Sequence, residues 1–300
     1  MFAPDHAGPA TQPATQPATP PRRPWQVGAL GVCVAVDVED PALDADLRTL
    51  LGDLRDELRG DVLSGLLDDG PPGDVGCDEP EHVVVHGRGP WRITSPAHTA
   101  TASTRPEAVS GVLTALNLTA VAGTPWLALH AAVLARDGAA LVLPGRSGLG
   151  KTTTTAALLS RGWDYVSDEA LCLRWADGTV VAYPRPLALS TWAATRLDVQ
   201  GLPGDGEVLV RPHQLGARVA NGPVTVAHVV LLERDGSDPT LQPSGRVQGL
   251  ESLLRRGFTT AQDPARALTA LSDVLAAARV WTLRLGDPGQ AADLLTERLR

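Results

Sequence analysis

The sequence predicts an α/β core with a mixed sheet over residues 126–300, preceded by a small α+β domain over residues 25–125. Short apolar runs bounded by Gly, Pro and Asp indicate buried strands, and longer segments place apolar residues at helical spacing. The Asp137-Gly138 pair joins two apolar runs in the manner of a hairpin turn. Strands and helices do not alternate regularly in the second half, so its sheet should contain antiparallel pairs.

The first part of the chain divides into a tail and a compact unit. Residues 1–24 are rich in proline and repeat Thr-Gln-Pro-Ala, so we expect a disordered tail. The expected elements of the compact unit are a strand over 27–36, a helix over 41–60, strands over 82–86 and 91–94, and a helix over 106–122. This unit shows no residue pattern of its own that indicates chemistry.

The second half contains most of the predicted regular structure. Its expected strands are 127–135, 139–143, 165–166, 170–174, 179–183, 224–233 and 280–285. Its expected helices are 152–161, 250–256, 264–278 and 289–299, and Gly162 is placed to end the first of them.

Composition restricts the class of partner and compartment. An apolar fraction of 43% and a charged fraction of 20% are ordinary for a soluble globular protein. The formal net charge of -8 and the absence of a basic run argue against nucleic acid as a partner. No apolar stretch is long enough to span a membrane, and residues 1–24 lack a secretory apolar core, so we expect a cytoplasmic protein. Cys33, Cys77 and Cys172 are scattered and odd in number, which favours reduced thiols.

The basic residues of the chain are almost all arginine, and lysine occurs once, at Lys151. Lysine presents a compact charge on a thin stem, whereas arginine is planar and forked. Only the lysine side chain fits inside a loop that wraps around a phosphate. The single lysine therefore occupies a position where the forked arginine side chain would not fit.

Lys151 belongs to the pattern Gly145-x-x-x-x-Gly150-Lys151-Thr152, a P-loop between an apolar strand and a helix. Glycines let consecutive N–H groups point at phosphate oxygens, and the helix start adds its dipole. Lys151 should reach the β- and γ-phosphates, and the Thr152 hydroxyl should ligate Mg²⁺. The residues expected to contact nucleotide are Gly145, Arg146, Ser147, Gly148, Leu149, Gly150, Lys151, Thr152 and Thr153.

The residues downstream of the loop narrow the class of P-loop protein. A guanine motif of the form Asn-Lys-x-Asp is impossible without a second lysine, and no Leu-Ser-Gly-Gly-Gln signature of transport ATPases is present. The acidic pair Asp168-Glu169 comes after Lys151 with only one helix and one short strand between them. Carboxylates this close to the loop favour phosphoryl transfer, because a carboxylate beside the γ-phosphate orients an incoming hydroxyl and accepts its proton. ATP is the expected nucleotide, with GTP left open.

Four segments together resemble the HPr kinase/phosphorylase family. These are His130-Ala131-Ala132-Val133, the P-loop, Arg161-Gly162, and Val166-Ser167-Asp168-Glu169, where the family has a histidine-opened strand, Gly-x-Ser-Gly-x-Gly-Lys-Ser/Thr, Arg-Gly and Asp-Asp. The resemblance covers residues 126–190 most specifically and implies the HPr kinase type of P-loop core. The family's members are serine kinases acting on proteins or peptides. Its short relatives accompany ribosomally made peptide natural products, including lasso peptides.

The resemblance also implies roles for single residues. Asp168 would hold Mg²⁺ or act as the base, Glu169 would take the place of the second carboxylate, and His130 would be the family's histidine. Which carboxylate is the base stays open. The long glycine-rich signature of bacterial HPr kinases is not recognisable, and residues 183–187 resemble the short relatives instead, so HPr itself is not the expected substrate. Arg185 is a candidate phosphate clamp in this segment. Further candidates that the sequence cannot rank are Arg211, Arg234 and Arg246.

Three functions are compatible with these features. The first is a Mg²⁺- and ATP-dependent kinase for a serine-type hydroxyl of a peptide or small protein, such as a natural-product precursor. The second is a regulatory ATPase module without an acceptor, and the third is a kinase for a small-molecule alcohol. Neither nucleic acid nor a membrane is an expected partner. The family resemblance implies a homo-oligomer, although the sequence shows no interface.

Overall fold

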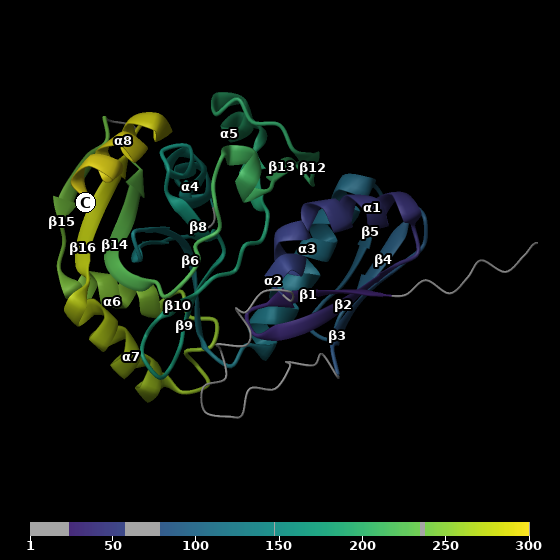
Figure 1. Ribbon diagram of the computed structural model, residues 1–300, viewed down its shortest axis with the longest axis horizontal. Helices are drawn as coiled ribbons and strands as arrows, with labels where there is room; N and C mark the ends of the chain where they lie inside the picture. The colour runs from purple at the N-terminus through teal and green to yellow at the C-terminus, as the bar shows by residue number, and fades with distance from the viewer. Residues whose placement is uncertain (1–23, 58–78, 147, 235–237, 300) are drawn as a thin grey trace, which may run out of the picture.

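A computed structural model describes residues 24–57, 79–146, 148–234 and 238–299. The described chain forms two parts that lie side by side, with the first in purple and blue and the second in teal to yellow (Figure 1). Most of the Pro-rich segment predicted as a tail lies outside the described residues, as do Cys77 and Ser147. Within the described ranges, no helix combines the length and the apolarity that crossing a bilayer requires.

The first part is a five-stranded sheet covered by helices. Its strands are β1 (Trp25–Ala29), β2 (Val32–Val38), β3 (Glu81–His86), β4 (Trp91–Thr94) and β5 (Thr99–Ala102), in that spatial order. Only the β2–β3 pair is parallel. Its helices are α1 (Pro41–Leu50), α2 (Gly52–Glu57) and α3 (Arg105–Gly123). The long helix α3 packs on several of the strands and begins at a capping box formed by Thr104 and Glu107.

Two predictions for this part are wrong in detail. The single strand expected over 27–36 is the hairpin β1–β2, which turns at Leu30 (φ 54°) and Gly31 (φ 76°). A leucine in the left-handed region is uncommon, so the local sequence gives little sign of the turn. The helix expected over 41–60 is broken into α1 and α2 at Leu51, and its last residues lie outside the described chain.

The second part is built on an eight-stranded sheet with the order β10-β9-β6-β7-β14-β16-β15, in which β8 also pairs with β6. The strands are β6 (Leu127–Arg136), β7 (Ala139–Pro144), β8 (Asp164–Ser167), β9 (Ala170–Leu173), β10 (Val180–Val181), β14 (Thr225–Arg234), β15 (Thr240–Pro243) and β16 (Arg279–Leu285). The pairs β7–β14 and β14–β16 are parallel and the others are antiparallel. The sheet is therefore mixed, and the predicted α/β class with a preceding α+β unit is confirmed.

Helices cover both faces of this sheet. They are α4 (Lys151–Leu159), α5 (Thr191–Arg196), α6 (Arg246–Leu254), α7 (Pro264–Ala277) and α8 (Pro288–Arg298). Helices α4 and α8 share one buried core with the sheet, and α6 and α7 share another with its opposite side. A small sheet of β11 (Leu187–Ser190), β13 (Glu207–Val210) and β12 (Leu202–Pro203), followed by the 3₁₀ helix η1 (Pro212–Leu215), packs on the α4 side. The sequence did not predict this sheet.

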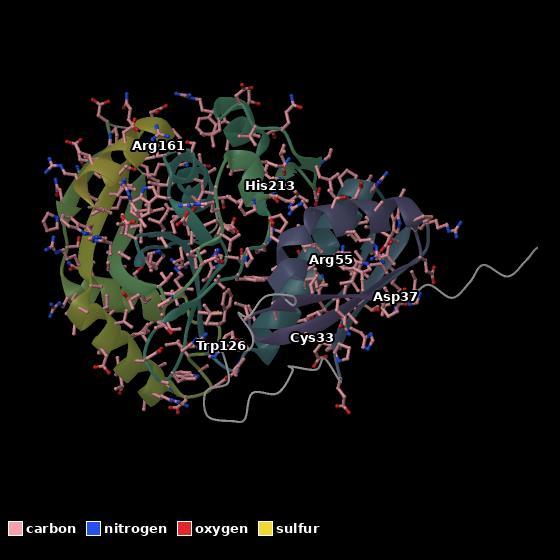
Figure 2. The ribbon with its side chains drawn as sticks, viewed as in Figure 1. Cys33, Asp37, Arg55, Trp126, Arg161 and His213 are labelled. Atoms are coloured by element: carbon pink, nitrogen blue, oxygen red, sulfur yellow. The ribbon has the colours of Figure 1, made fainter. Side chains whose placement is uncertain are left out.

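The two parts are joined by a common core and by polar contacts. Ala128, Cys172 and Tyr183 of the second part are buried in the same apolar cluster as the helices of the first. The ring of Trp126 lies against Gly31, and Figure 2 labels it at the junction. Arg211 binds Asp53 through two hydrogen bonds of 2.7 and 3.1 Å. The second part is thus packed firmly against the first.

The cysteines depart from the expectation of three reduced thiols. Cys33 of β2 is disulfide-bonded. Cys172 of β9 is a free, buried thiol, and burial raises its pKa far above the ordinary value. The scattered spacing of the cysteines in the sequence gave no sign of this bond.

Candidate functional site

The P-loop connects β7 to α4, as the strand–loop–helix pattern predicted. Gly148 (φ 78°) and Gly150 (φ 108°) adopt left-handed backbone, and Gly150 is the N-cap of α4. A Cβ at Gly150 would lie 3.1 Å from Leu285 Cδ1 and 3.5 Å from an Arg234 guanidinium nitrogen. The loop therefore requires glycine here both for its dihedral angle and for space. Unpaired N–H groups at the start of a helix such as α4 favour an anion.

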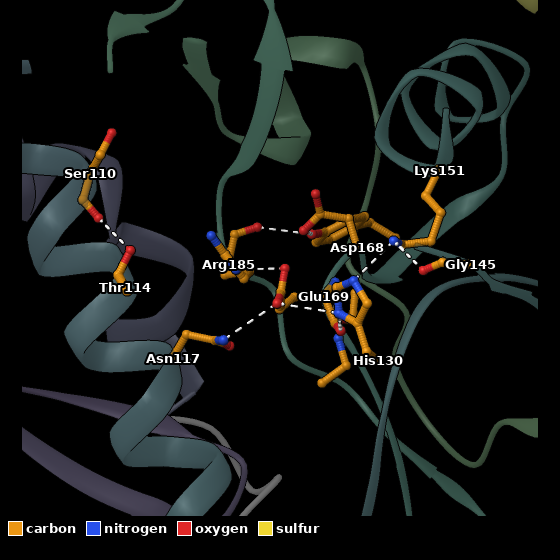
Figure 3. A network of polar contacts seen from close by, with 12 residues as sticks. Ser110, Thr114, Asn117, His130, Gly145, Lys151, Asp168, Glu169 and Arg185 are labelled. Atoms are coloured by element: carbon orange, nitrogen blue, oxygen red, sulfur yellow. Dashed lines mark hydrogen bonds and ion pairs between the residues drawn. The ribbon is translucent and has the colours of Figure 1, made fainter. Parts of the chain in front are cut away.

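Lys151, the first residue of α4, is buried to 6% exposure at the base of this loop. Its Nζ donates to the Gly145 carbonyl at 2.8 Å and lies 3.0 Å from His130 Nε2 (Figure 3). Burial lowers the pKa of the ammonium, and the charges of Glu169 and Asp168 oppose that effect. The lysine is thus fixed in place by neighbours before any phosphate arrives.

His130 lies on β6 between the lysine and the carboxylate pair. Its Nδ1 is 3.0 Å from the backbone carbonyl of Glu169, which can only accept a hydrogen bond. This contact places the ring proton on Nδ1 and leaves Nε2 to accept from the Lys151 ammonium. The edge of Phe258 packs on the ring at a centroid distance of 5.7 Å. His130 therefore links Lys151 to Glu169 rather than standing alone in the core.

Glu169 is surrounded by donors. Its side chain lies 3.3 Å from His130 Nδ1, 3.1 Å from an Arg185 nitrogen and 3.4 Å from the amide nitrogen of Asn117. Burial raises the pKa of this carboxyl, but the His130 hydrogen bond and the Arg185 charge outweigh it and lower the pKa to about 2. Glu169 is therefore a permanent carboxylate that orders the groups around it.

Asp168, the neighbouring carboxylate, has the opposite environment. It is 5% exposed, and its Oδ1 lies 3.1 Å from the hydroxyl of the buried Tyr165. Burial raises the pKa of Asp168 to about 6; Arg185 opposes the shift and Glu169 adds to it. The Tyr165 hydroxyl has one proton and also lies 2.9 Å from the Arg185 carbonyl, so the two acceptors compete for it. Asp168 is the carboxylate of the pair that can exchange a proton near neutral pH.

Arg185 follows β10 and has a side chain that is 13% exposed. Burial disfavours its charge, but Glu169 and Asp168 outweigh that effect and raise its pKa, so it remains a cation. The guanidinium is paired with Glu169 at 3.1 Å, and the residue also lines the cavity that contains the carboxylates. Its position orders the Glu169 carboxylate at the wall of the cavity.

These groups line one cavity of about 960 Å³, toward the upper end of the roughly 300–1,000 Å³ typical of ligand pockets. Seven predicted site residues besides His130 and Arg185 contribute to its wall: Gly148, Gly150, Lys151, Thr152, Thr153, Asp168 and Glu169. Three described P-loop residues do not. Gly145 holds Lys151 through its carbonyl, Arg146 is exposed, and Leu149 packs against the apolar core. Ser147 lies outside the described residues.

The structure adds site residues that the sequence did not single out. It also shows which of the three unranked arginines, Arg211, Arg234 and Arg246, lies at the cavity. Tyr165 and Asn117 contact the carboxylates, and Arg234 lines the cavity beside Gly150. Arg211 instead binds Asp53, and Arg246 donates to the Ala276 carbonyl, so neither belongs to the site. One signal could have distinguished Arg234 from Arg211 and Arg246. Arg234 ends the strand that pairs in parallel with β7, the strand before the P-loop.

Arg161 of the Arg161-Gly162 pair connects two helices and does not line the cavity. Its guanidinium donates to the carbonyls of Ala157 and Gly289 and to the Asp293 carboxylate, which ties the end of α4 to α8. Figure 2 labels this residue beside α8. Gly162 adopts φ 82° and turns the chain into β8. The pair thus orients the P-loop helix without touching the cavity.

Comparisons with known proteins add little to this geometry. No protein-family model matches the chain, and no curated protein matches it. Among solved structures, the chain is similar to the Hpr(Ser) kinase/phosphatase from Coxiella burnetii, with 16% identity over 57% of this chain and 95% of that chain. The TM-score of that superposition is 0.29, a value too low to support a conclusion about function.

Proposed function

We propose that the chain is a Mg²⁺-dependent phosphotransferase that moves the γ-phosphoryl group of ATP to a serine-type hydroxyl of a peptide or small protein. The observation that supports this most directly is the pairing of two adjacent carboxylates with opposite proton affinities beside the P-loop lysine. Titratable neighbours held apart in pKa are the arrangement that acid–base chemistry at neutral pH requires. A module that only binds nucleotide as a switch has no need of such a base.

Asp168 is assigned as the proton acceptor in this reaction. The acceptor hydroxyl attacks the γ-phosphorus, its proton passes to an Asp168 oxygen, and the bond to the β,γ-bridging oxygen breaks to release ADP. A pKa near 6 leaves Asp168 mostly deprotonated at neutral pH yet able to hold the proton. Glu169 keeps Arg185 and His130 in place, and Arg185 and Lys151 face the negative charge of the transferred group.

The residues present also suit magnesium. Mg²⁺ is usually held by one or two carboxylates together with substrate phosphates, so a cage of protein ligands is not needed. Within the described residues no cluster of three His, Cys, Asp or Glu side chains that could hold a metal ion exists, whereas Thr152 and the Asp168-Glu169 pair line the same cavity. The Thr152 hydroxyl would hold the ion together with substrate phosphates, and the ion would supply charge neutralisation; Asp168, the other residue expected as a ligand, is assigned here as the base instead.

The acceptor class follows from the family resemblance and from the shape of the site. The resemblance implies a protein or peptide hydroxyl, and the precursor of a ribosomally made peptide natural product is the specific acceptor we propose. Asn117 of the first part lies 3.4 Å from Glu169, so the first part of the chain also reaches the carboxylate pair. A large cavity leaves room for an acceptor side chain beside the nucleotide.

The test has two steps. Peptides encoded by neighbouring genes are incubated with the protein, ATP and Mg²⁺, and mass spectrometry should show a gain of one phosphate on a serine. Asp168→Asn should then retain ATP binding but lose transfer by about 10²–10⁴-fold, while the exposed Asp273→Asn on α7 serves as the matched control. Transfer by Asp168→Asn at the wild-type rate would refute the assignment of the base. Loss of ATP without a phosphorylated product would favour the regulatory ATPase instead.

A further inference from the structure

The cavity extends well beyond the reacting groups to a second end with a different character. Trp192, on the first turn of α5, lines this end although 60% of its surface is exposed. Pro288 and Gln290 line it as well, whereas Leu285 lies against Gly150 of the P-loop. Exposed tryptophan in a cavity wall is unusual, because its large apolar face gains free energy when something covers it.

The chain places Trp192 at the far end from the carboxylates. From Arg185 the backbone runs through β11, whose Ala188 and Ser190 line the cavity, and then into α5. Arg196, one turn after Trp192 on the same face of α5, pairs with Asp287 at 2.6 Å. Since Asp287 is the N-cap of α8, this ion pair holds α5 against the 285–290 turn. Trp192 and Pro288 therefore line the cavity from two elements that this ion pair holds together.

A nucleotide bound to the P-loop would run toward this end. Lys151 beside Asp168 and Glu169 marks the terminal phosphates, because the P-loop lysine contacts the β- and γ-phosphates. Thr153 continues the cavity wall along α4, away from the carboxylates. The sugar and base must then lie beyond Thr153, since the reacting end is occupied by Arg185, Glu169 and the acceptor.

From this placement we infer that Trp192 is the stacking platform for the nucleobase, with Pro288 as a second apolar contact of the ring. This inference rests on the proposed nucleotide-dependent function and assigns the part of the site that reads the base. Asp287, which lies between Leu285 and Pro288 in the sequence and also lines the cavity, is committed to Arg196 and to the cap of α8. The exposed carboxamide of Gln290 offers a donor and an acceptor to the edge of the base.

The experiment separates base binding from phosphate binding. Dissociation constants for ATP and for inorganic tripolyphosphate, both with Mg²⁺, are measured by calorimetry on wild type, Trp192→Leu and Trp192→Phe. Stacking of one base on an aromatic side chain corresponds to about 5- to 150-fold in affinity. Trp192→Leu should weaken ATP by that factor and leave tripolyphosphate unchanged, and Trp192→Phe should restore most of the loss. Trp175→Phe, a tryptophan packed under Arg266, is the control for loss of an indole elsewhere.

Each other outcome overturns the inference in a recognisable way. Unchanged ATP affinity in Trp192→Leu would mean that the base binds elsewhere, and the proposed function would stand. An equal loss for ATP and tripolyphosphate would mean that Trp192 acts on the phosphate site. A loss confined to the acceptor peptide would make Trp192 part of the acceptor site. Failure of the wild type to bind either ligand would remove the proposed function together with the inference.

Discussion

The two ends of the P-loop cavity are built in contrasting ways. At the reacting end, His130, Lys151, Glu169 and Arg185 are held by hydrogen bonds and ion pairs of 2.8–3.3 Å. Trp192 and Gln290 line the far end and Arg234 lies beside Gly150, and none of these three side chains makes a hydrogen bond or ion pair within the described chain. One end is a completed network, and the other is an open surface.

This difference indicates what each end has to do. Groups that stabilise a transition state must be fixed beforehand, because reorganisation during the reaction raises the barrier. Groups that recognise a substrate need accessible surface and gain their free energy when the ligand covers them. If the contrast between a fixed end and an open end holds, substitutions at the fixed end should have the larger effects.

Substitution of Lys151 should have the largest effect, because this side chain connects the loop to the network. Lys151→Ala removes the cation and should reduce nucleotide turnover by about 10²–10³-fold or more. Lys151→Arg keeps the charge but brings a planar fork into a space bounded by the Gly145 carbonyl and His130. We expect it to fail as well, as measured by ATP consumption. Arg218→Lys on the surface is the control, and full activity of Lys151→Arg would show that the network tolerates a forked cation.

The second prediction concerns the stability cost of Asp168. Its pKa in the folded chain is about 6, against an ordinary value of 3.8, so the folded state binds the proton more tightly. Stability should therefore fall as pH rises from about 4 to about 6 and remain lower by up to about 3 kcal/mol above that range. Asn does not titrate, so Asp168→Asn should be more stable than wild type at neutral and alkaline pH, and the difference should vanish near pH 4.

Urea unfolding without nucleotide or Mg²⁺ measures this difference at about pH 8 and about pH 4. Asp273→Asn should show no comparable change, because that carboxylate is exposed on α7. A less stable Asp168→Asn at the higher pH would mean that the carboxylate contributes more through its contacts than burial costs. The contrast between Asp168 and Glu169 would then have to be abandoned.

The smallest effect is expected for Arg234, whose side chain makes no hydrogen bond or ion pair within the described chain. Arg234 lies beside Gly150 and is exposed, so it should attract the phosphates only through a screened charge. Arg234→Ala should weaken ATP binding by about twofold to fivefold at low salt, and less at high salt. Arg255→Ala, which breaks an exposed pair with Glu251 on α6, is the matched control. An effect that does not change with salt would place Arg234 in direct, desolvated contact with the nucleotide.

The sequence predicted the parts of the fold that local patterns determine. Strands β6 and β7 follow from long apolar runs on either side of Asp137-Gly138, which adopts positive φ at both positions. The small sheet of β11, β12 and β13 was missed because its strands are two to four residues long and only partly buried. Such strands exist through their packing on α4, which no local pattern records.

Part of the site could also be predicted, because local sequence patterns determine that part. The P-loop pattern and the short separation of Asp168-Glu169 from Lys151 predicted that these groups lie together, and they line one cavity. The distinction between the two carboxylates was not foreseeable. It depends on Asn117, His130 and Arg185, which reach Glu169 from α3, from β6 and from the segment after β10. Their convergence is a property of the tertiary structure.

The apolar core shared by the two parts of the chain limits how the protein can be truncated or recombined. Ala170, Cys172 and Leu209 of the P-loop part are buried among side chains of the first part. Removing residues 25–125 would expose these apolar surfaces directly behind the carboxylate pair and would take Asn117 away from Glu169. The two parts consequently form one cooperative unit, and the P-loop half is not a module that can be recombined with other partners on its own.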